Sequence, residues 1–196
     1  MKLLVVADHE SPYIWDFFDH KRFKDIDMII SAGDLKASYL SFLVTMIPAP
    51  LFYVPGNHDN RYVIAPPEGC ECIDDKVVLS NGLVIGGLGG SIRYSPDSPY
   101  QYTEAEMKKR SAKLERQIKK HEKIDILVSH APAYQLGDAS DPCHVGFEAL
   151  RALIIKYQPR LFLHGHQHLT YGRQTRMMHL GNTTIVNCFG YHIIEI

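Results

Sequence analysis

The chain has 196 residues, of which 45% are hydrophobic and 22% are charged. These proportions are ordinary for a folded globular protein, and the length suits one domain with a sizeable core, so we expect a single domain over residues 1–196. The formal charge of −1 makes no general case for binding to nucleic acids or membranes, and it does not exclude a local charged patch.

Cysteine usage and the first residues bear on the compartment. Cys70 and Cys72 are too close together for the usual zinc spacing and have no matching second pair, so we expect reduced thiols. The apolar stretch after Met1 is too short for a signal peptide, and no run approaches the length of a membrane span. The sequence therefore predicts a cytoplasmic protein without a membrane partner.

Short apolar runs alternate with helical patterns, which predicts an α/β fold with parallel crossovers. A capping box at Thr103 and Glu106 predicts a helix that runs to about residue 122. Asn81-Gly82 between two apolar runs predicts a hairpin, and the last two runs predict an antiparallel pair. Further helices are expected at 38–46 and 147–157. The expected strands are 2–7, 28–32, 51–54, 77–80, 83–86, 126–129, 161–164, 183–187 and 192–196.

Metal-binding side chains follow several of these strands. Because ligands of open α/β sheets bind beyond the carboxyl ends of the strands, we expect these side chains to converge. A pair of divalent ions roughly 3.5–4 Å apart needs a bridging carboxylate, and Asp34 after Gly33 suits that role. The side chains are Asp8, Asp34, Asn57, His58, Asp59, His130, His166 and His168.

The ordered set of motifs resembles the calcineurin-like metallophosphoesterase superfamily, in its small single-domain bacterial and archaeal type. The resemblance implies a metallo-dependent phosphatase-like fold, which is a four-layer α/β/β/α sandwich of two mixed sheets. It also implies a phosphoric ester hydrolase with two divalent ions, Mn²⁺ first and Fe²⁺, Mg²⁺, Zn²⁺ or Ni²⁺ as alternatives. The motifs are Asp8-His9-Glu10, Gly33-Asp34-Leu35-Lys36-Ala37, Gly56-Asn57-His58-Asp59, His130 and Gly165-His166-Gln167-His168.

The same resemblance assigns roles to these residues. His58 is implied as the general acid, or as a cation on the phosphate, and a metal-bound hydroxide as the attacking group. The first metal is assigned to Asp8, Asp34 and His168, with help from the position two after Asp8, and the second to Asp34, Asn57, His130 and His166.

The chain departs from the family pattern at two positions. Glu10 stands where the family has a histidine, and three interpretations stay open: Glu10 binds the metal directly, His9 replaces it, or water fills the gap. We favour direct binding, because residues two apart in a strand share a face. Ala37 stands where the family often has the aspartate that orients the catalytic histidine. His58 must then be steered by Asp59, by a backbone carbonyl or by water, or be loosely held.

Some candidates lie outside the core motifs. Arg61, Arg93 and His144 are candidates for substrate binding, and a surface loop position explains each at least as well. His164 is expected to support a ligand or to pack in the core rather than to bind metal. The basic helix over 104–123 is expected to be a solvated face, so nucleic acid is a partner that we do not favour.

Our functional hypothesis is a dinuclear phosphodiesterase that acts on a phosphate ester. No cap domain is evident, so we expect an open site. The alternatives are a phosphomonoesterase or protein phosphatase, a non-catalytic metal-binding scaffold of the same fold, and a nuclease. The sequence does not indicate an oligomeric state.

Overall fold

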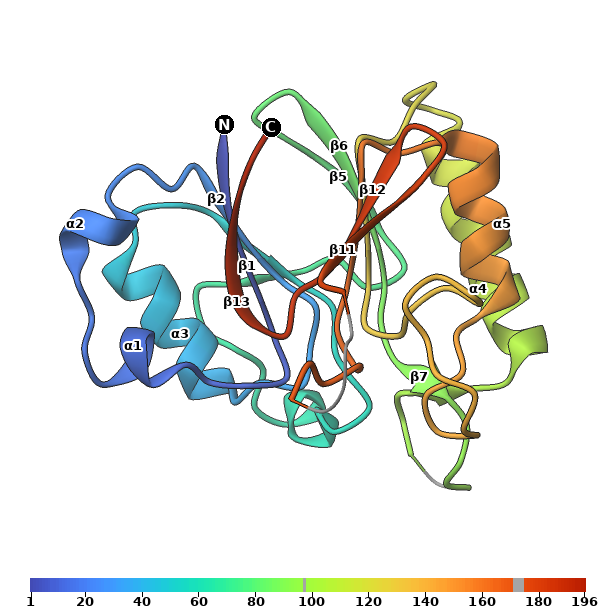
Figure 1. The fold of residues 1–196 in the computed structure, drawn as a ribbon, viewed down its shortest axis with the longest axis horizontal. Coiled ribbons are helices and arrows are strands. Elements are labelled where there is room, and N and C mark those ends of the chain that lie inside the picture. The colour runs from blue at the N-terminus through green and yellow to red at the C-terminus, as the bar shows by residue number, and fades with distance from the viewer. Residues whose placement is uncertain (97, 171–174) are drawn as a thin grey trace.

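Two β-sheets lie face to face with helices on both outer sides, which gives the expected four layers (Figure 1). The structure is a computed structural model that describes residues 1–96, 98–170 and 175–196. Apolar side chains of both sheets, such as Val5 and Ile126, meet in the central core. A second cluster lies under the helices of each sheet. The mixed α/β sandwich predicted from the resemblance is therefore confirmed.

The first sheet has the strand order β13-β1-β2-β3-β4. The β1 strand pairs in parallel with β2 and antiparallel with β13, so the sheet is mixed. Its strands are β1 (Lys2–Ala7), β2 (Met28–Ser31), β3 (Leu51–Tyr53), β4 (Glu71–Cys72) and β13 (Gly190–Glu195).

The second sheet has the order β11-β12-β10-β9-β6-β5, with antiparallel pairs only at its two edges. Its strands are β5 (Val77–Ser80), β6 (Leu83–Leu88), β9 (Ile126–Ser129), β10 (Leu161–His164), β11 (Met177–Leu180) and β12 (Thr183–Asn187). A separate two-stranded ribbon joins β7 (Ser91–Ile92) and β8 (Gln101–Tyr102).

The helices divide between the two outer layers. The predicted capping box at Thr103 and Glu106 is present at the start of α4, whose Met107, Leu114 and Ile118 are buried against the second sheet. The first sheet carries α1 (Pro12–Trp15), α2 (His20–Phe23) and α3 (Ala37–Met46), the second carries α4 (Glu104–Ile118) and α5 (Glu148–Tyr157), and a 3₁₀ turn, η1, covers Asn60–Val63.

The predicted antiparallel pairing of the last two strands is wrong. β12 pairs with β10 and β11 in the second sheet, whereas β13 crosses to the first sheet and pairs with β1. The antiparallel partner of β12 is β11, an edge strand that alternates between exposed and half-buried residues and so lacks a continuous apolar run. Gly181-Asn182 between β11 and β12 is a short hairpin signal that would have revealed it.

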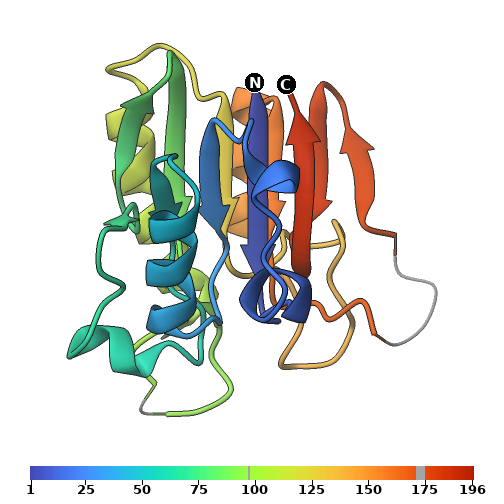
Figure 2. The ribbon, with the colours of Figure 1, turned by 90° about the vertical axis from the view of Figure 1, so that its left-hand side faces the viewer.

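The carboxyl ends of β1, β2, β3, β9 and β10 lie at one end of the sandwich, and the two termini lie at the other (Figures 1 and 2). At that far end, the amino group of Met1 donates to the carbonyl of Ile196 at 2.8 Å. Within the part of the chain that the structure describes, none of the helices combines the length and apolar character needed to cross a bilayer. The loops that carry the sequence motifs therefore share one end of the fold.

Candidate metal centre

Three motif residues leave their strands with a left-handed backbone. The φ angles are 62° at Asp8, 56° at Asp34 and 67° at His166. Non-glycine residues rarely adopt this region, and each instance costs about 1–3 kcal/mol where the surroundings hold it. Such backbone conformations cluster at functional sites. Here the chain turns sharply at all three residues, at the end of the sandwich where the two sheets meet.

Motif glycines allow the loops to approach one another. A Cβ on Gly56 would lie 2.1 Å from Oδ1 of Asp34, and one on Gly165 would lie 2.7 Å from Oδ2 of Asp8. Gly33 has φ 94°, and its Cβ would lie 2.4 Å from the backbone nitrogen of Gly56. The glycines thus make room for carboxylates that come from other strands.

Asp34, His130 and His166 form a cluster whose possible ligand atoms all lie within 4.8 Å of one another. Nε2 of His130 lies 3.2 Å from Oδ2 of Asp34 and 2.9 Å from Oδ1 of Asn57. Nδ1 of His130 lies 2.7 Å from the carbonyl of Ala32 and donates to it. This contact fixes the ring so that Nε2 faces the other oxygens.

Asp8 and His168 lie next to this cluster. Both carboxylate oxygens of Asp8 accept from the backbone N–H of His166 at 3.0 Å. Nε2 of His168 lies 3.9 Å from Oδ1 of Asp8, and its ring lies 5.0 Å from the ring of Phe189. Asp8 is therefore positioned by the strand-end turn of β10, which belongs to the other sheet.

The site residues have strongly shifted pKa values. Burial raises the pKa of Asp8 to about 7. Burial would also raise the pKa of Asp34, but the charge and hydrogen bond of His130 outweigh it and hold that pKa at about 2. The reciprocal effect overcomes burial at His130 and raises its pKa to about 9, whereas burial lowers the pKa of His166 to about 3.

The donor set fits a divalent cation. Oδ2 of Asp34, Oδ1 of Asn57 and Nε2 of His130 point at one another, so a cation that displaces a proton from Nε2 would find two oxygens and one nitrogen here. Nε2 of His166 donates to the carbonyl of Cys143 at 2.8 Å, which leaves Nδ1 as a lone-pair nitrogen. Oxygen and imidazole ligands of this kind suit Mn²⁺, Fe²⁺ and Zn²⁺.

Glu10 does not join the cluster of Asp34, His130 and His166. Its Oε1 accepts from the backbone N–H of Lys36 at 3.1 Å, and its Oε2 accepts from Nζ of Lys36 at 3.0 Å. β1 ends at Ala7 and Asp8 has a positive φ, so residues 8 and 10 do not share a strand face as expected. His9 stacks on Phe189 at 5.8 Å between ring centroids. Direct binding of a metal by Glu10 stays a prediction for the metal-loaded protein.

Asp59 supports the loop rather than the His58 ring. Its Oδ2 accepts from the backbone N–H groups of Asp34 at 2.8 Å and Gly56 at 2.7 Å. His58 is exposed, and its backbone N–H donates to Oδ1 of Asp34 at 2.8 Å. Among the described residues, no hydrogen bond to the His58 imidazole is present. Its proposed steering by Asp59 is therefore absent from this structure.

The remaining candidates occupy different places. Arg61 lies beside His58 on the wall of one cavity. Arg93 points to α4, where it bonds Glu106 at 2.9 Å and the carbonyl of Gln101. His144 bonds Asp141 at 2.8 Å, and its ring lies 5.0 Å from that of His166. His144 thus borders the metal centre, whereas Arg93 is engaged elsewhere.

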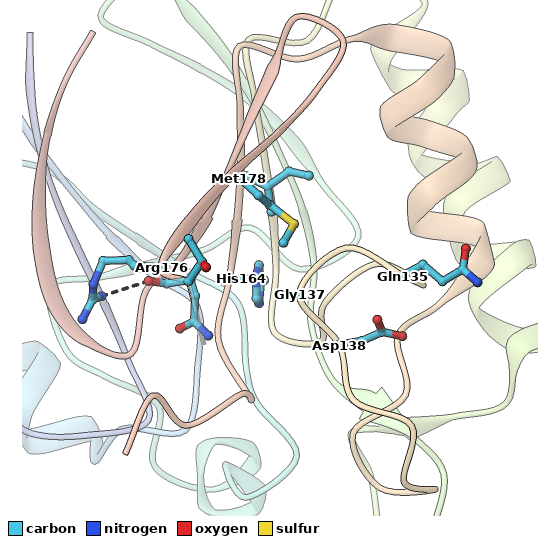
Figure 3. A pocket seen from close by; sticks show the side chains of 9 residues that line it. Gln135, Gly137, Asp138, His164, Arg176 and Met178 are labelled. Atoms are coloured by element: carbon cyan, nitrogen blue, oxygen red, sulfur yellow. Dashed lines mark hydrogen bonds between the residues drawn. The ribbon is translucent and has the colours of Figure 1, made fainter. Parts of the chain in front are cut away.

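His164 lies in a second cavity of about 320 Å³, between β10 and the loop that carries Gly137 and Asp138 (Figure 3). Its side chain is buried, and Nδ1 bonds the carbonyl of Gly165 at 3.0 Å. Burial lowers the pKa of His164 to about 4. This placement agrees with the prediction that His164 does not belong to the set of metal ligands.

Several residues outside the set of candidate ligands also shape the site. Nδ2 of Asn57 donates to the hydroxyl of Tyr94 at 2.9 Å, which turns Oδ1 toward His130. The carbonyl of Cys143, the ring of Phe189 and the ammonium of Lys36 also contact motif residues. Backbone carbonyls and ring contacts leave no motif in a sequence, and only the position of Lys36 inside the Gly33–Ala37 motif was a signal.

The comparisons with known proteins agree with this geometry. A family model described as calcineurin-like phosphoesterase matches residues 1–169. The uncharacterized protein MJ1162 of Methanocaldococcus jannaschii is 28% identical over 187 residues, which cover 85% of this chain and 79% of that protein.

Solved structures share the fold. TT1561 of Thermus thermophilus has a TM-score of 0.65 at 15% identity, and the match covers 96% of this chain and 89% of that one. Vps29 of Entamoeba histolytica, solved in complex with Zn²⁺, has a TM-score of 0.50 at 14% identity and covers 100% and 86%. Because the family model spans most of the sequence and the motif residues converge at one end of the fold, this chain belongs to the calcineurin-like phosphoesterase family.

Proposed function

We propose that the protein is a dinuclear metal-dependent phosphodiesterase. The observation that carries this proposal is the convergence of acceptor atoms from Asp34, Asn57 and His130, with Asp8 and His168 alongside. Bound cations would stabilise such a set of acceptors. Without them, burying these acceptors and charges costs free energy that no partner offsets. Manganese is the first candidate, and the protein is proposed to act in the cytoplasm.

Different residues are proposed to bind the cations and the substrate. Asp34, with one oxygen toward His130 and the other toward the backbone N–H of His58, would be the ligand shared between two ions. Asp8 and His168 would hold one ion, and Asn57, His130 and His166 the other. When bound, two divalent ions supply Lewis-acid stabilisation of the phosphoryl oxygens and lower the pKa of water. The exposed His58 is positioned to give a hydrogen bond or a proton to the leaving oxygen.

A diester is favoured because no part of the described chain covers the site as a separate cap, and the cavity beside His58 offers about 450 Å³. That volume accommodates a group beyond the phosphate itself. Monoesters and diesters both have a leaving group that this cavity could hold, so the preference for a diester rests on the open site.

The nuclease alternative has less support, since much of the positive charge on α4 is already paired. Lys108 lies near Glu104 and Glu148, and Arg110 pairs with Asp74 and Asp75. The scaffold alternative draws support from Glu10, whose carboxylate is bonded to Lys36.

The test is turnover with added Mn²⁺ of a bis-aryl phosphodiester, an aryl monoester, cyclic nucleotides and an oligonucleotide. We expect the diester to have the highest kcat/KM, and we expect Asn57→Ala and His58→Ala to reduce it. A protein that binds no metal and turns over none of these esters would support the scaffold instead. Preferred cleavage of the oligonucleotide, with steep salt dependence, would support the nuclease.

A further inference from the structure

A cavity of about 450 Å³ opens beside Asp34, on the side of the metal centre where His58 lies. Its polar lining comes from Glu10, Asp34, Lys36, Ser38, His58, Asp59 and Arg61, and Ala37 contributes only a methyl group. Leu35, Tyr62 and Ala65 add an apolar wall. The cavity therefore combines an apolar surface with charged groups and hydrogen-bond donors.

These polar groups are not equally available. Lys36 and Glu10 satisfy each other, because the ammonium and the backbone N–H of Lys36 bond both oxygens of Glu10 at 3.0 and 3.1 Å. Arg61 forms no ion pair within the described parts of the chain. The imidazole of His58 also lacks a bonded partner among these residues. Arg61 and His58 thus remain as free donors on the same cavity wall.

The carboxylates that line the cavity are already engaged, Glu10 by Lys36 and Asp34 by His130 and the backbone N–H of His58. The carboxylate of Asp59, which also lines the cavity, is engaged by the backbone N–H groups of Asp34 and Gly56. Ala37 has no charged atom to offer. A guanidinium binds carboxylate and phosphate groups in a bidentate manner, so an anion from the substrate is the partner that fits Arg61.

We propose that this cavity holds the leaving group of the ester, and that this group has an apolar body and an anionic group of its own that pairs with Arg61 beside His58. The inference rests on the proposed phosphodiesterase function and adds the class of substrate. It assigns Arg61 to substrate choice.

The test compares two matched phosphodiesters with Mn²⁺ present. One has a 4-(carboxymethyl)phenyl leaving group, and the other has the methyl ester of the same group, so that charge changes while size and leaving ability stay similar. We expect kcat/KM to be about fivefold to tenfold higher for the charged substrate, and the difference to shrink at high salt.

Arg61→Gln is expected to bring the ratio of the two kcat/KM values close to one, and Arg61→Glu to invert it. Arg116→Gln, a matched loss of an exposed arginine on α4, should keep the wild-type ratio. Equal turnover of both substrates by the wild type would overturn this inference while leaving the phosphodiesterase standing. A ratio unchanged in Arg61→Gln would overturn it as well. No turnover of either substrate would overturn the proposed function, and this inference with it.

Discussion

Asp34 is the residue on which the metal centre depends most. One of its oxygens accepts from the backbone N–H of His58 and the other faces Nε2 of His130, so it connects loops that come from both sheets. Its own backbone N–H is fixed by Asp59. Removing the charge of Asp34 without changing its shape therefore tests the site at its centre.

Asp34→Asn is expected to lower the metal content and to reduce kcat/KM by more than about 100-fold, because loss of a ligand should cost at least as much as loss of a supporting group. Metal content measured by mass spectrometry and diesterase rates check this. Asp16→Asn removes an exposed carboxylate and serves as the matched control. Full metal content in Asp34→Asn would contradict its proposed position between two ions.

Metal binding should also depend on pH, because the metal-free site holds protons that a cation must displace. His130 has a pKa raised to about 9 by Asp34, and Asp8 has a pKa raised to about 7 by burial. Affinity should therefore fall as pH drops below about 9, and fall more steeply below about 7. Calorimetry in buffers of different ionisation enthalpy should detect proton release. Binding without any proton release at a pH of about 7 would be inconsistent with these protonation states.

At the scale of elements, the ends of the strands and the glycines beside them bring the carboxylates into place. A Cβ on Gly56 would collide with Oδ1 of Asp34 at 2.1 Å, so Gly56→Ala should displace Asp34 and weaken metal binding. Gly82→Ala is the control, because Gly82 has a positive φ (77°), which strains an alanine, but a Cβ there meets no atom within 4 Å. Both variants should lose some stability, and only Gly56→Ala should lose metal affinity in a titration.

The capping box of α4 should contribute to the stability of the fold and not to metal binding. Thr103→Ala removes the side-chain oxygen that accepts from the backbone N–H of Glu106. The expected cost is about 1 kcal/mol, which corresponds to a drop in Tm of roughly 2–4 °C. Metal affinity should not change, because the start of α4 contacts none of the candidate ligands. A loss of affinity equal to that of Gly56→Ala would show that the two regions are coupled.

The sequence predicted most strands and the candidate metal ligands that converge at their ends, because buried parallel strands are apolar runs and these side chains follow directly. The prediction failed where contacts between distant segments of the chain determine the pairing of strands. The crossing of β13 to the first sheet is set by pairing with β1, which lies at the other end of the chain. The expectation that residues 8 and 10 share a strand face failed for a local reason, since the strand rule assumes extended backbone and Asp8 leaves it. The contact of Glu10 with Lys36 is likewise invisible in the order of residues.

At the scale of the whole molecule, the metal centre lies where the two sheets meet. Asp8, Asp34 and Asn57 follow strands of the first sheet, and His130, His166 and His168 follow strands of the second. Hydrogen bonds from the His166 backbone to Asp8, and from His130 to Asp34, join the sheets at this end. Cations held by both sets should therefore stabilise the sandwich as a unit, as any ligand of the folded state does.

The most direct measurement is a crystal structure grown with excess Mn²⁺, with anomalous scattering used to locate the metal. We predict two manganese peaks about 3.5–4 Å apart, with Asp34 contacting both. Asp8 and His168 should complete one coordination shell, and Asn57, His130 and His166 the other. A single peak, a vacant site or manganese bound elsewhere would contradict the dinuclear centre and the phosphodiesterase proposed from it.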